Sequence, residues 1–502
     1  MHVSGRGEDV AVVLAAGFAV RVWLIHRYPI VFGHDTIVRL AKAEHIVLAH
    51  QLPLLQAVIH YLKGVSNSVV VVRYFMALVG AVAGVGFFLL MSDLVPREAA
   101  LEAAFLFIAS PRILTESIVP NQEILMLAGL AFAFHFAFGE RWELASVGLG
   151  LACLTRYEAW LACPVLAVPY LGQSGVDPRT LLNAVALFGW GPLGWIAYNR
   201  GLTPRGSYAV EWSANPERLL RWGHLGAATL RAGTLPTLCL AALGAATFVE
   251  KRLFETTAYQ MLVAFLALFL IALLFSAHGI DQRGDRGERF VTEREAHIPL
   301  AGMVILAGLG LSVLPRFRPE ITAVSIAVGL WMAARYVRRW SSEPHFALSY
   351  QVGKYLDRHV ASREEVAVLA RGVDVGTRLD ALERDHGPGA VREALRIIRS
   401  MGTMPIDYDR ILVHSTLGKD RLRSYATLEL GRLASLGAPP PAARAVARPH
   451  WVVLWSDFAP TNATEASLAA DVTAREPRQV FEQDGVWVRL YSLGGTVAQP
   501  YA

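Results

Sequence analysis

A succession of apolar runs occupies the first two thirds of the chain and leaves few folds open to it. A transmembrane helix needs about 20 predominantly apolar residues to cross about 30 Å of hydrocarbon. Several runs are shorter, so they must extend into their polar flanks or lie inside a bundle. We therefore expect an α-helical polytopic membrane protein with about 11 transmembrane helices. The runs are 10–29, 69–91, 99–110, 124–138, 144–155, 159–171, 181–198, 232–249, 259–277, 298–314 and 320–337.

The composition agrees with a membrane protein and excludes other classes. Of the 502 residues, 54% are hydrophobic and only 18% charged, with a mean hydropathy of +0.38, which is too apolar for a soluble protein of this length. The net charge of +5 is spread along the chain, so no nucleic-acid partner is expected. Cys153, Cys163 and Cys239 lie inside apolar runs, which indicates neither a disulfide framework nor a zinc site.

Residues 341–502 differ in character from residues 1–340. They alternate amphipathic segments (349–359 and 389–399) with short apolar strands (451–455 and 486–491), a pattern typical of a small soluble α/β domain. The sequence therefore predicts a transmembrane domain over 1–340 and a soluble domain over 341–502.

The first run follows a short polar start without a small-residue cleavage site, so it is expected to be a retained span. Counting Lys and Arg does not decide the orientation, because both sets of loops contain arginines.

With the N-terminus inside, and a break in the long run 144–171, five polar clusters face one compartment, as in a site at one membrane face. An odd number of spans places 341–502 on the same, extracytoplasmic side. The frequent Ala and Arg suggest a prokaryotic inner or plasma membrane. The clusters are His34–Asp35, Glu116–Glu123, Arg156–Glu158, Tyr198–Trp212 and His278–Glu295.

The first cluster contains His34 and Asp35, followed by Arg39 and Lys42. In a helix beginning at Thr36, Asp35, Arg39 and Lys42 share one face, and such an amphipathic helix lies in the membrane interface. Its cationic face suits a lipid phosphate, and Asp35 lies where a polar acceptor would meet a lipid-borne donor. The alternative is a solvated loop in which Asp35 caps the helix.

The second and third clusters place carboxylates and an arginine near membrane depth. Glu116 and Glu123 lie between two short apolar runs, where carboxylates are functional candidates; the alternative is a polar turn with Glu123 at a helix N-terminus. Arg156 and Glu158 interrupt an apolar stretch, where Arg156 either binds a phosphate or is neutralised by Glu158. In the last cluster, a glycine-rich solvated loop, Arg289 is the candidate residue.

The order of these pieces over residues 10–340 resembles the GT-C superfamily of membrane glycosyltransferases, including protein O-mannosyltransferases, lipid A aminoarabinose transferases and oligosaccharyltransferase catalytic subunits. A soluble domain after the last span also fits. The motifs that carry the resemblance are Gly33–Asp35, the stretch from Ser110–Pro111 to Asn121–Glu123, Leu154–Arg156, and Glu288–Phe290 followed by Ile298–Pro299.

The resemblance implies that Asp35 is the catalytic base or orients the acceptor, that Glu123 is the second acidic position, and that Arg289 meets the carrier phosphate. The chain departs from the family at Asp35–Thr36, where many relatives have Asp-Glu, and at Asn121–Glu123, where oligosaccharyltransferases have Asp-Asn-Glu. The missing aspartate at Asn121 argues against a metal site; no cofactor is expected, although the resemblance leaves a divalent cation open.

The function implied is transfer of a sugar from a polyprenyl-phosphate-linked donor to a lipid, glycan or protein acceptor, with inversion. Asp35 and Glu123 would be catalytic; His34, Arg39, Lys42, Glu116, Arg156, Glu158 and Arg289 would bind substrate or the donor phosphate. Two other classes stay open: a transporter or lipid flippase with Asp35 and Glu123 on its path, and a non-catalytic scaffold. An enzyme requires Asp35, Glu123 and Arg289 to converge at one membrane face.

Overall fold

The computed structural model describes residues 4–30, 52–66, 69–199, 217–275, 296–359, 365–369, 426–427, 450–456, 458 and 463–493. These residues form two compact units. We call the described residues of 1–27, 50–55 and 73–337 the helical unit, and those of 28–49, 56–72 and 338–502 the sheet unit.

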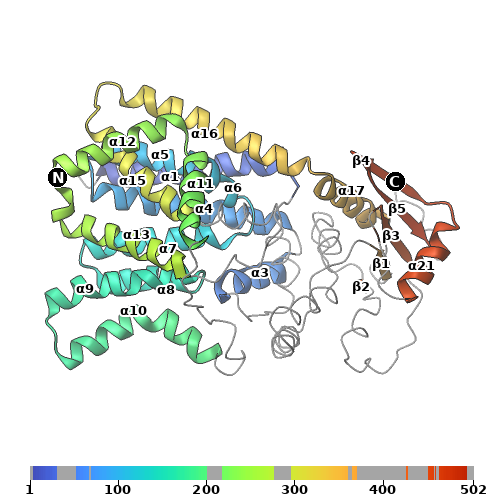
Figure 1. Cartoon of the computed structure of the whole chain (residues 1–502), viewed down its shortest axis with the longest axis horizontal. Coiled ribbons are helices and arrows are strands. Elements are labelled where there is room, and N and C mark those ends of the chain that lie inside the picture. The colour runs from blue at the N-terminus through green and yellow to red at the C-terminus, as the bar shows by residue number, and fades with distance from the viewer. Residues whose placement is uncertain are drawn as a thin grey trace. The chain divides into compact units, whose positions relative to one another are not determined.

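Each apolar run of the sequence coincides with an α-helix (Figure 1). The expected break in the run 144–171 is confirmed, because a 3₁₀ turn, η1 (Tyr157–Leu161), separates α8 from α9. Further elements between these helices are α3 (Pro53–Val65), α6 (Pro111–Glu116), α11 (Glu217–Ala232) and η2 (Leu253–Glu255). The helices of the runs are α1 (Ser4–Arg27), α4 (Val69–Ser92), α5 (Arg97–Ala109), α7 (Gln122–Phe138), α8 (Trp142–Cys153), α9 (Ala162–Ser174), α10 (Pro178–Asn199), α12 (Leu235–Glu250), α13 (Thr257–Phe275), α15 (His297–Ser312) and α16 (Arg318–Ser341).

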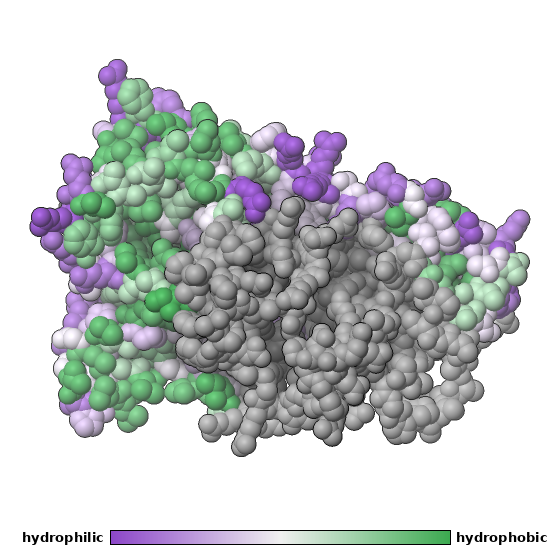
Figure 2. Space-filling model, in the orientation of Figure 1, coloured by the Kyte–Doolittle hydropathy of each residue, from purple (hydrophilic) through white to green (hydrophobic). Residues whose placement is uncertain are grey.

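Among the described residues, four helical stretches are long and apolar enough to cross a membrane, namely Arg6–Arg27, Val69–Ser92, Pro178–Ala197 and Arg318–Ser341. A fifth would be the pair α11–α12, which is bent by 116°. Helices α7, α8, α13 and α15 are apolar but shorter, so the count of about 11 spans stays a prediction. Apolar side chains cover much of the exposed face of the helical unit (Figure 2).

Glycines let the backbones of neighbouring helices approach closely in this unit. A Cβ built on Gly129 of α7 would lie 2.7 Å from the carbonyl oxygen of Gly148 in α8. A Cβ on Gly244 of α12 would overlap the carbonyl oxygen of Leu306 in α15. Small residues at such contacts are typical of membrane helix bundles, where backbone packing replaces the hydrophobic drive.

The ends of successive helices lie alternately at the two ends of the helical unit. The start of α1, the α9–α10 connection and the α12–α13 connection lie on the left in Figure 1. Contacts agree with this: Arg97 at the start of α5 pairs with Asp9 of α1, and the Tyr259 hydroxyl of α13 donates to the Leu94 carbonyl, which precedes α5, at 3.2 Å. The start of α7, the end of α8 and the start of α15 therefore share the other end.

The sheet unit contains a five-stranded mixed sheet in the order β2-β1-β3-β5-β4. Strands β2 and β3 are parallel to β1, and β5 is antiparallel to β3 and β4. Buried side chains of α17 form one hydrophobic core with the sheet, and those of α21 form a second core with it. The elements are β1 (Glu365–Leu369), β2 (Ala426–Thr427), β3 (Trp451–Trp455), β4 (Gln479–Gln483), β5 (Val486–Ser492), α17 (Pro344–His359) and α21 (Ala463–Thr473).

Three of the four segments expected in 341–502 coincide with these elements. Residues 349–359 lie in α17, 451–455 form β3, and 486–491 lie in β5. The segment 389–399 lies outside the described residues. The domain boundary at 340 and the extracytoplasmic placement of 341–502 stay predictions.

Candidate active site

The first half of the site is the short segment that leads from α5 to α7. Pro111 starts α6, as proline commonly does at the first position of a helix. The helix ends after Glu116 and a turn leads to Asn121, whose extended backbone (φ −110°, ψ 141°) starts α7. Every residue of α6 is buried, so its polar side chains must find partners within the protein.

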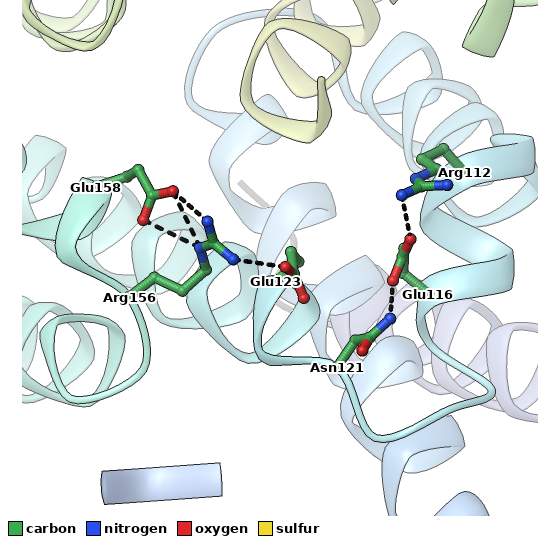
Figure 3. A network of polar contacts seen from close by, with 6 residues as sticks. All are labelled: Arg112, Glu116, Asn121, Glu123, Arg156 and Glu158. Carbon is green, nitrogen blue, oxygen red and sulfur yellow. Dashed lines mark hydrogen bonds and ion pairs between the residues drawn. The ribbon is translucent and has the colours of Figure 1, made fainter. Parts of the chain in front are cut away.

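Arg112 and Glu116 form a buried ion pair within this segment. Their four-residue spacing places both side chains on one face of α6, with Nη2 of Arg112 and Oε1 of Glu116 separated by 2.6 Å. Nη1 of Arg112 donates to the hydroxyl of Tyr336 in α16 at 2.8 Å. Asn121 donates its amide to the other oxygen of Glu116 (Figure 3). Glu116 therefore ties α6 to the start of α7.

Arg156 forms the second half of the site, between α8 and α9. The Thr155 hydroxyl, just after the end of α8, donates to the carbonyl of Ala152 in that helix at 2.6 Å. Arg156, the next residue, has an extended backbone (φ −148°, ψ 145°). This conformation projects the Arg156 guanidinium between two carboxylates. It donates from Nη1 to Glu123 at 2.6 Å and from Nε to both oxygens of Glu158 at 3.0 and 3.1 Å (Figure 3).

Burial makes these pairs strong and costly to break. The side chain of Glu123 is 1% exposed, and those of Arg156 and Glu158 are 16% and 22% exposed. Burial acts to raise the pKa of Glu158, but the charge and hydrogen bonds of Arg156 outweigh it and hold that pKa below its ordinary value. The Glu158 carboxylate is therefore described best as ionised.

His297 and Gln122 present further polar atoms to this region. His297 is the first residue of α15 and is 3% exposed. The charges of Glu123, Arg156, Arg112 and Glu158 all act on it. Among the described residues, neither Nδ1 of His297 nor Nε2 of Gln122 has a hydrogen-bond partner.

Four of the nine residues that the sequence singles out lie in the described part of the chain, and the structure brings them together. Glu123, Arg156 and Glu158 form one network, and Glu116 belongs to the adjacent one. The other five, His34, Asp35, Arg39, Lys42 and Arg289, lie outside the described residues. Within the described ranges no group of three or more His, Cys, Asp or Glu could hold a metal ion.

Sequence reasoning did not select Arg112 or His297, although signals for both were present. Arg112 lies four residues before Glu116, the spacing of a helical ion pair. His297 immediately precedes the apolar run 298–314, where a polar side chain must be buried or reach the interface.

Comparison with known proteins finds distant structural likeness. A crystal structure of the oligosaccharyltransferase from Archaeoglobus fulgidus in the apo form has a TM-score of 0.43 at 13% identity, covering 83% of this chain and 65% of that protein. A second structure of the same enzyme, in complex with Zn and sulfate, has a TM-score of 0.40 at 14% identity, covering 69% of this chain and 55% of that one. The chain thus spans less than two thirds of the length of either.

No protein-family model matches the chain. No curated protein sequence matches it. The functional proposal therefore rests on the residues of this chain.

Proposed function

We propose that this chain is an integral membrane glycosyltransferase that moves a sugar from a polyprenyl-phosphate-linked donor to an extracytoplasmic acceptor. The observation that carries the proposal is the pairing of Arg156 with Glu123 and Glu158 at one end of a strongly apolar helical unit. Ionised side chains at such a position are costly and mark functional sites by default. Their arrangement suits a reaction in which a hydroxyl loses a proton while a phosphate gains charge.

The proposed reaction is a single displacement with inversion at the anomeric carbon. The acceptor oxygen bonds to that carbon as the bond to the carrier phosphate breaks, and Asp35 takes the acceptor proton or aligns the hydroxyl. A positioned general base contributes about 10² to 10⁴ in rate. Because the phosphate departs as an anion, no protein acid has to protonate it.

Glu123 is proposed to act with Asp35 in orienting the acceptor. Its carboxylate is fixed by Arg156, so it would offer a pre-positioned hydrogen-bond acceptor instead of a mobile charge. Glu116, Glu158 and His34 are proposed substrate-binding residues around this pair.

The departing phosphate is assigned first to Arg289, with Arg39 and Lys42 at the interface. Arginine matches phosphate geometry well, but Nε, Nη1 and Nη2 of Arg156 all donate to carboxylates in this structure. Phosphate binding by Arg156 would therefore have to displace Glu123 or Glu158.

The test is Asp35→Asn in membranes supplied with a radiolabelled lipid-linked sugar. Transfer should fall by about 10² to 10⁴, the contribution expected of a general base. Asp177→Asn is the matched control, because Asp177 is an exposed residue that hydrogen-bonds Thr180 in the first turn of α10. Undiminished transfer by Asp35→Asn would overturn the assignment of Asp35.

An assay on the same membranes distinguishes an enzyme from a transporter. If the wild-type protein moves the labelled lipid across vesicles without transferring its sugar, the chain is a transporter or flippase and the proposed function fails.

A further inference from the structure

Arg21 is a charged residue that the proposed reaction does not use. It lies within the apolar stretch Arg6–Arg27 of α1, and its side chain is completely buried. An arginine stays protonated in proteins, and burying its charge carries a large desolvation cost. Such a residue in a membrane helix is expected to have a specific partner.

The partner of Arg21 is the turn that follows α6. Nε of Arg21 donates to the hydroxyl oxygen of Ser117 at 2.6 Å, and Nη1 donates to the carbonyl of Gly17 at 2.8 Å. The Ser117 hydroxyl in turn donates to the carbonyl of Leu114 at 2.9 Å. Ser117 is itself completely buried, so this hydroxyl uses both its donor and its acceptor capacity inside the protein.

A second buried arginine holds the next residue of the same turn. Nε of Arg73, from α4, donates to the carbonyl of Ile118 at 2.9 Å. Helix α4 also makes room for Arg21, since a Cβ on Gly80 would clash with Nε of Arg21 and lie 2.6 Å from Cβ of Ser117. Two arginines from different helices thus bind adjacent residues of one turn.

This turn joins Glu116 to Glu123, which belong to the two adjacent polar networks of the candidate active site. Glu116 immediately precedes Ser117, and Asn121, which donates to Glu116, leads into the first turn of α7 with Glu123. Any displacement of residues 117–118 would move both carboxylates relative to Arg112 and Arg156.

We propose that Arg21 is a positioning residue of the active site, acting through Ser117 to hold Glu116 and Glu123 in place. The expected effect on kcat rests on the proposed function. The expected effect on the position of the turn can be measured without any activity. A misplacement of about 1 Å of groups that act in catalysis can lower the rate by about 10²-fold.

The kinetic test compares Arg21→Met, Arg21→Lys and Ser117→Ala in sugar transfer. Arg21→Met and Ser117→Ala should each lower kcat, by up to about 10²-fold, with donor KM nearly unchanged, because neither residue is placed against substrate. The double variant should be no worse than the poorer single one, since both changes remove one interaction. Arg21→Lys keeps the charge but cannot reproduce both hydrogen bonds, so it should not restore kcat.

The matched control is Arg97→Gln. Arg97 also joins α1 to another helix, through Asp9, but its side chain is 49% exposed and it lies at the opposite end of the unit. It should leave kcat unchanged. Thermal unfolding of each detergent-solubilised variant separates a lowered kcat from loss of folded protein.

Hydrogen exchange of the backbone amides of residues 117–119 and 121 is the measurement that needs no activity, because Pro120 has no amide hydrogen. Exchange should be faster in Arg21→Met and in Gly80→Ala, in which the new methyl group displaces Arg21, and unchanged in Arg97→Gln. If wild-type membranes transfer no sugar, the proposed function fails, and exchange still tests the positioning role. Wild-type exchange and wild-type kcat in Arg21→Met would overturn the inference.

Discussion

At the scale of single residues, Arg156 decides the geometry of the site. Its three guanidinium nitrogens bind carboxylates from two different helical segments, Glu123 in α7 and Glu158 in η1. A lysine could not replace it, because an ammonium lacks the planar fork that binds one carboxylate with two nitrogens while a third binds another.

Arg156→Gln should therefore lower both stability and activity. It leaves Glu123 and Glu158 without this cation, and removing one partner of a buried ion pair costs about 3 kcal/mol or more. We expect a lower free energy of unfolding in detergent, together with the loss of transfer in the radiolabelled-lipid assay.

Arg252→Gln provides the comparison for Arg156→Gln. Arg252 pairs with Glu255 at 3.7 Å, but the two side chains are 75% and 59% exposed, and exposed pairs contribute little to stability. Equal losses in the two variants would show that the Arg156 network has no special role.

At the scale of elements, the helical unit depends on glycines at helix contacts. Gly244 of α12 and Gly310 of α15 face each other across one interface, where a Cβ on either would overlap a backbone carbonyl of the partner helix. The neighbouring backbone cannot rotate away as a flexible side chain would, so the helices would have to separate.

Gly244→Ala and Gly310→Ala should each destabilise the protein by about 1–3 kcal/mol, the usual cost of overpacking a close contact. Gly194→Ala in α10 is the control, because a Cβ there meets no atom within 4 Å and alanine has the higher helix propensity. The measurement is the unfolding midpoint in denaturant; a Gly244→Ala midpoint at or above that of Gly194→Ala would contradict the observed packing.

At the scale of the whole molecule, the proposed reaction requires one particular orientation in the membrane. The site lies at the end of the helical unit opposite the contact between Arg97 and Asp9. An extracytoplasmic acceptor requires the site end to face outward and the loop with Lys251 and Arg252 to face the cytoplasm.

Cysteine labelling tests this arrangement. In a chain with its three cysteines replaced by alanine, Glu482→Cys in β4 should react with a membrane-impermeant maleimide added to intact cells, whereas Glu255→Cys in η2 should react only after permeabilisation. Both positions are exposed, so their difference reports the compartment. The reverse labelling pattern would place residues 341–502 in the cytoplasm and refute the topology.

Much of this protein could be predicted from patterns that are local in the sequence. The apolar runs indicated the helices, because burial or lipid contact requires continuous apolar surface. The interruption at Thr155–Glu158 indicated a break, and period-two alternation indicated β5. Glu116, Glu123, Arg156 and Glu158 were selected because each places a charge beside apolar sequence.

The partners of these charges were decided only by the tertiary structure. Glu158 lies two residues from Arg156, and this spacing indicated a local ion pair. The same guanidinium also binds Glu123, which is 33 positions away. Arg21 was a charge in the middle of the first apolar run, and its hydrogen bond reaches Ser117, 96 positions along the chain. Local patterns report which side chains need a partner, whereas the packing of distant helices determines which partner lies within hydrogen-bond distance.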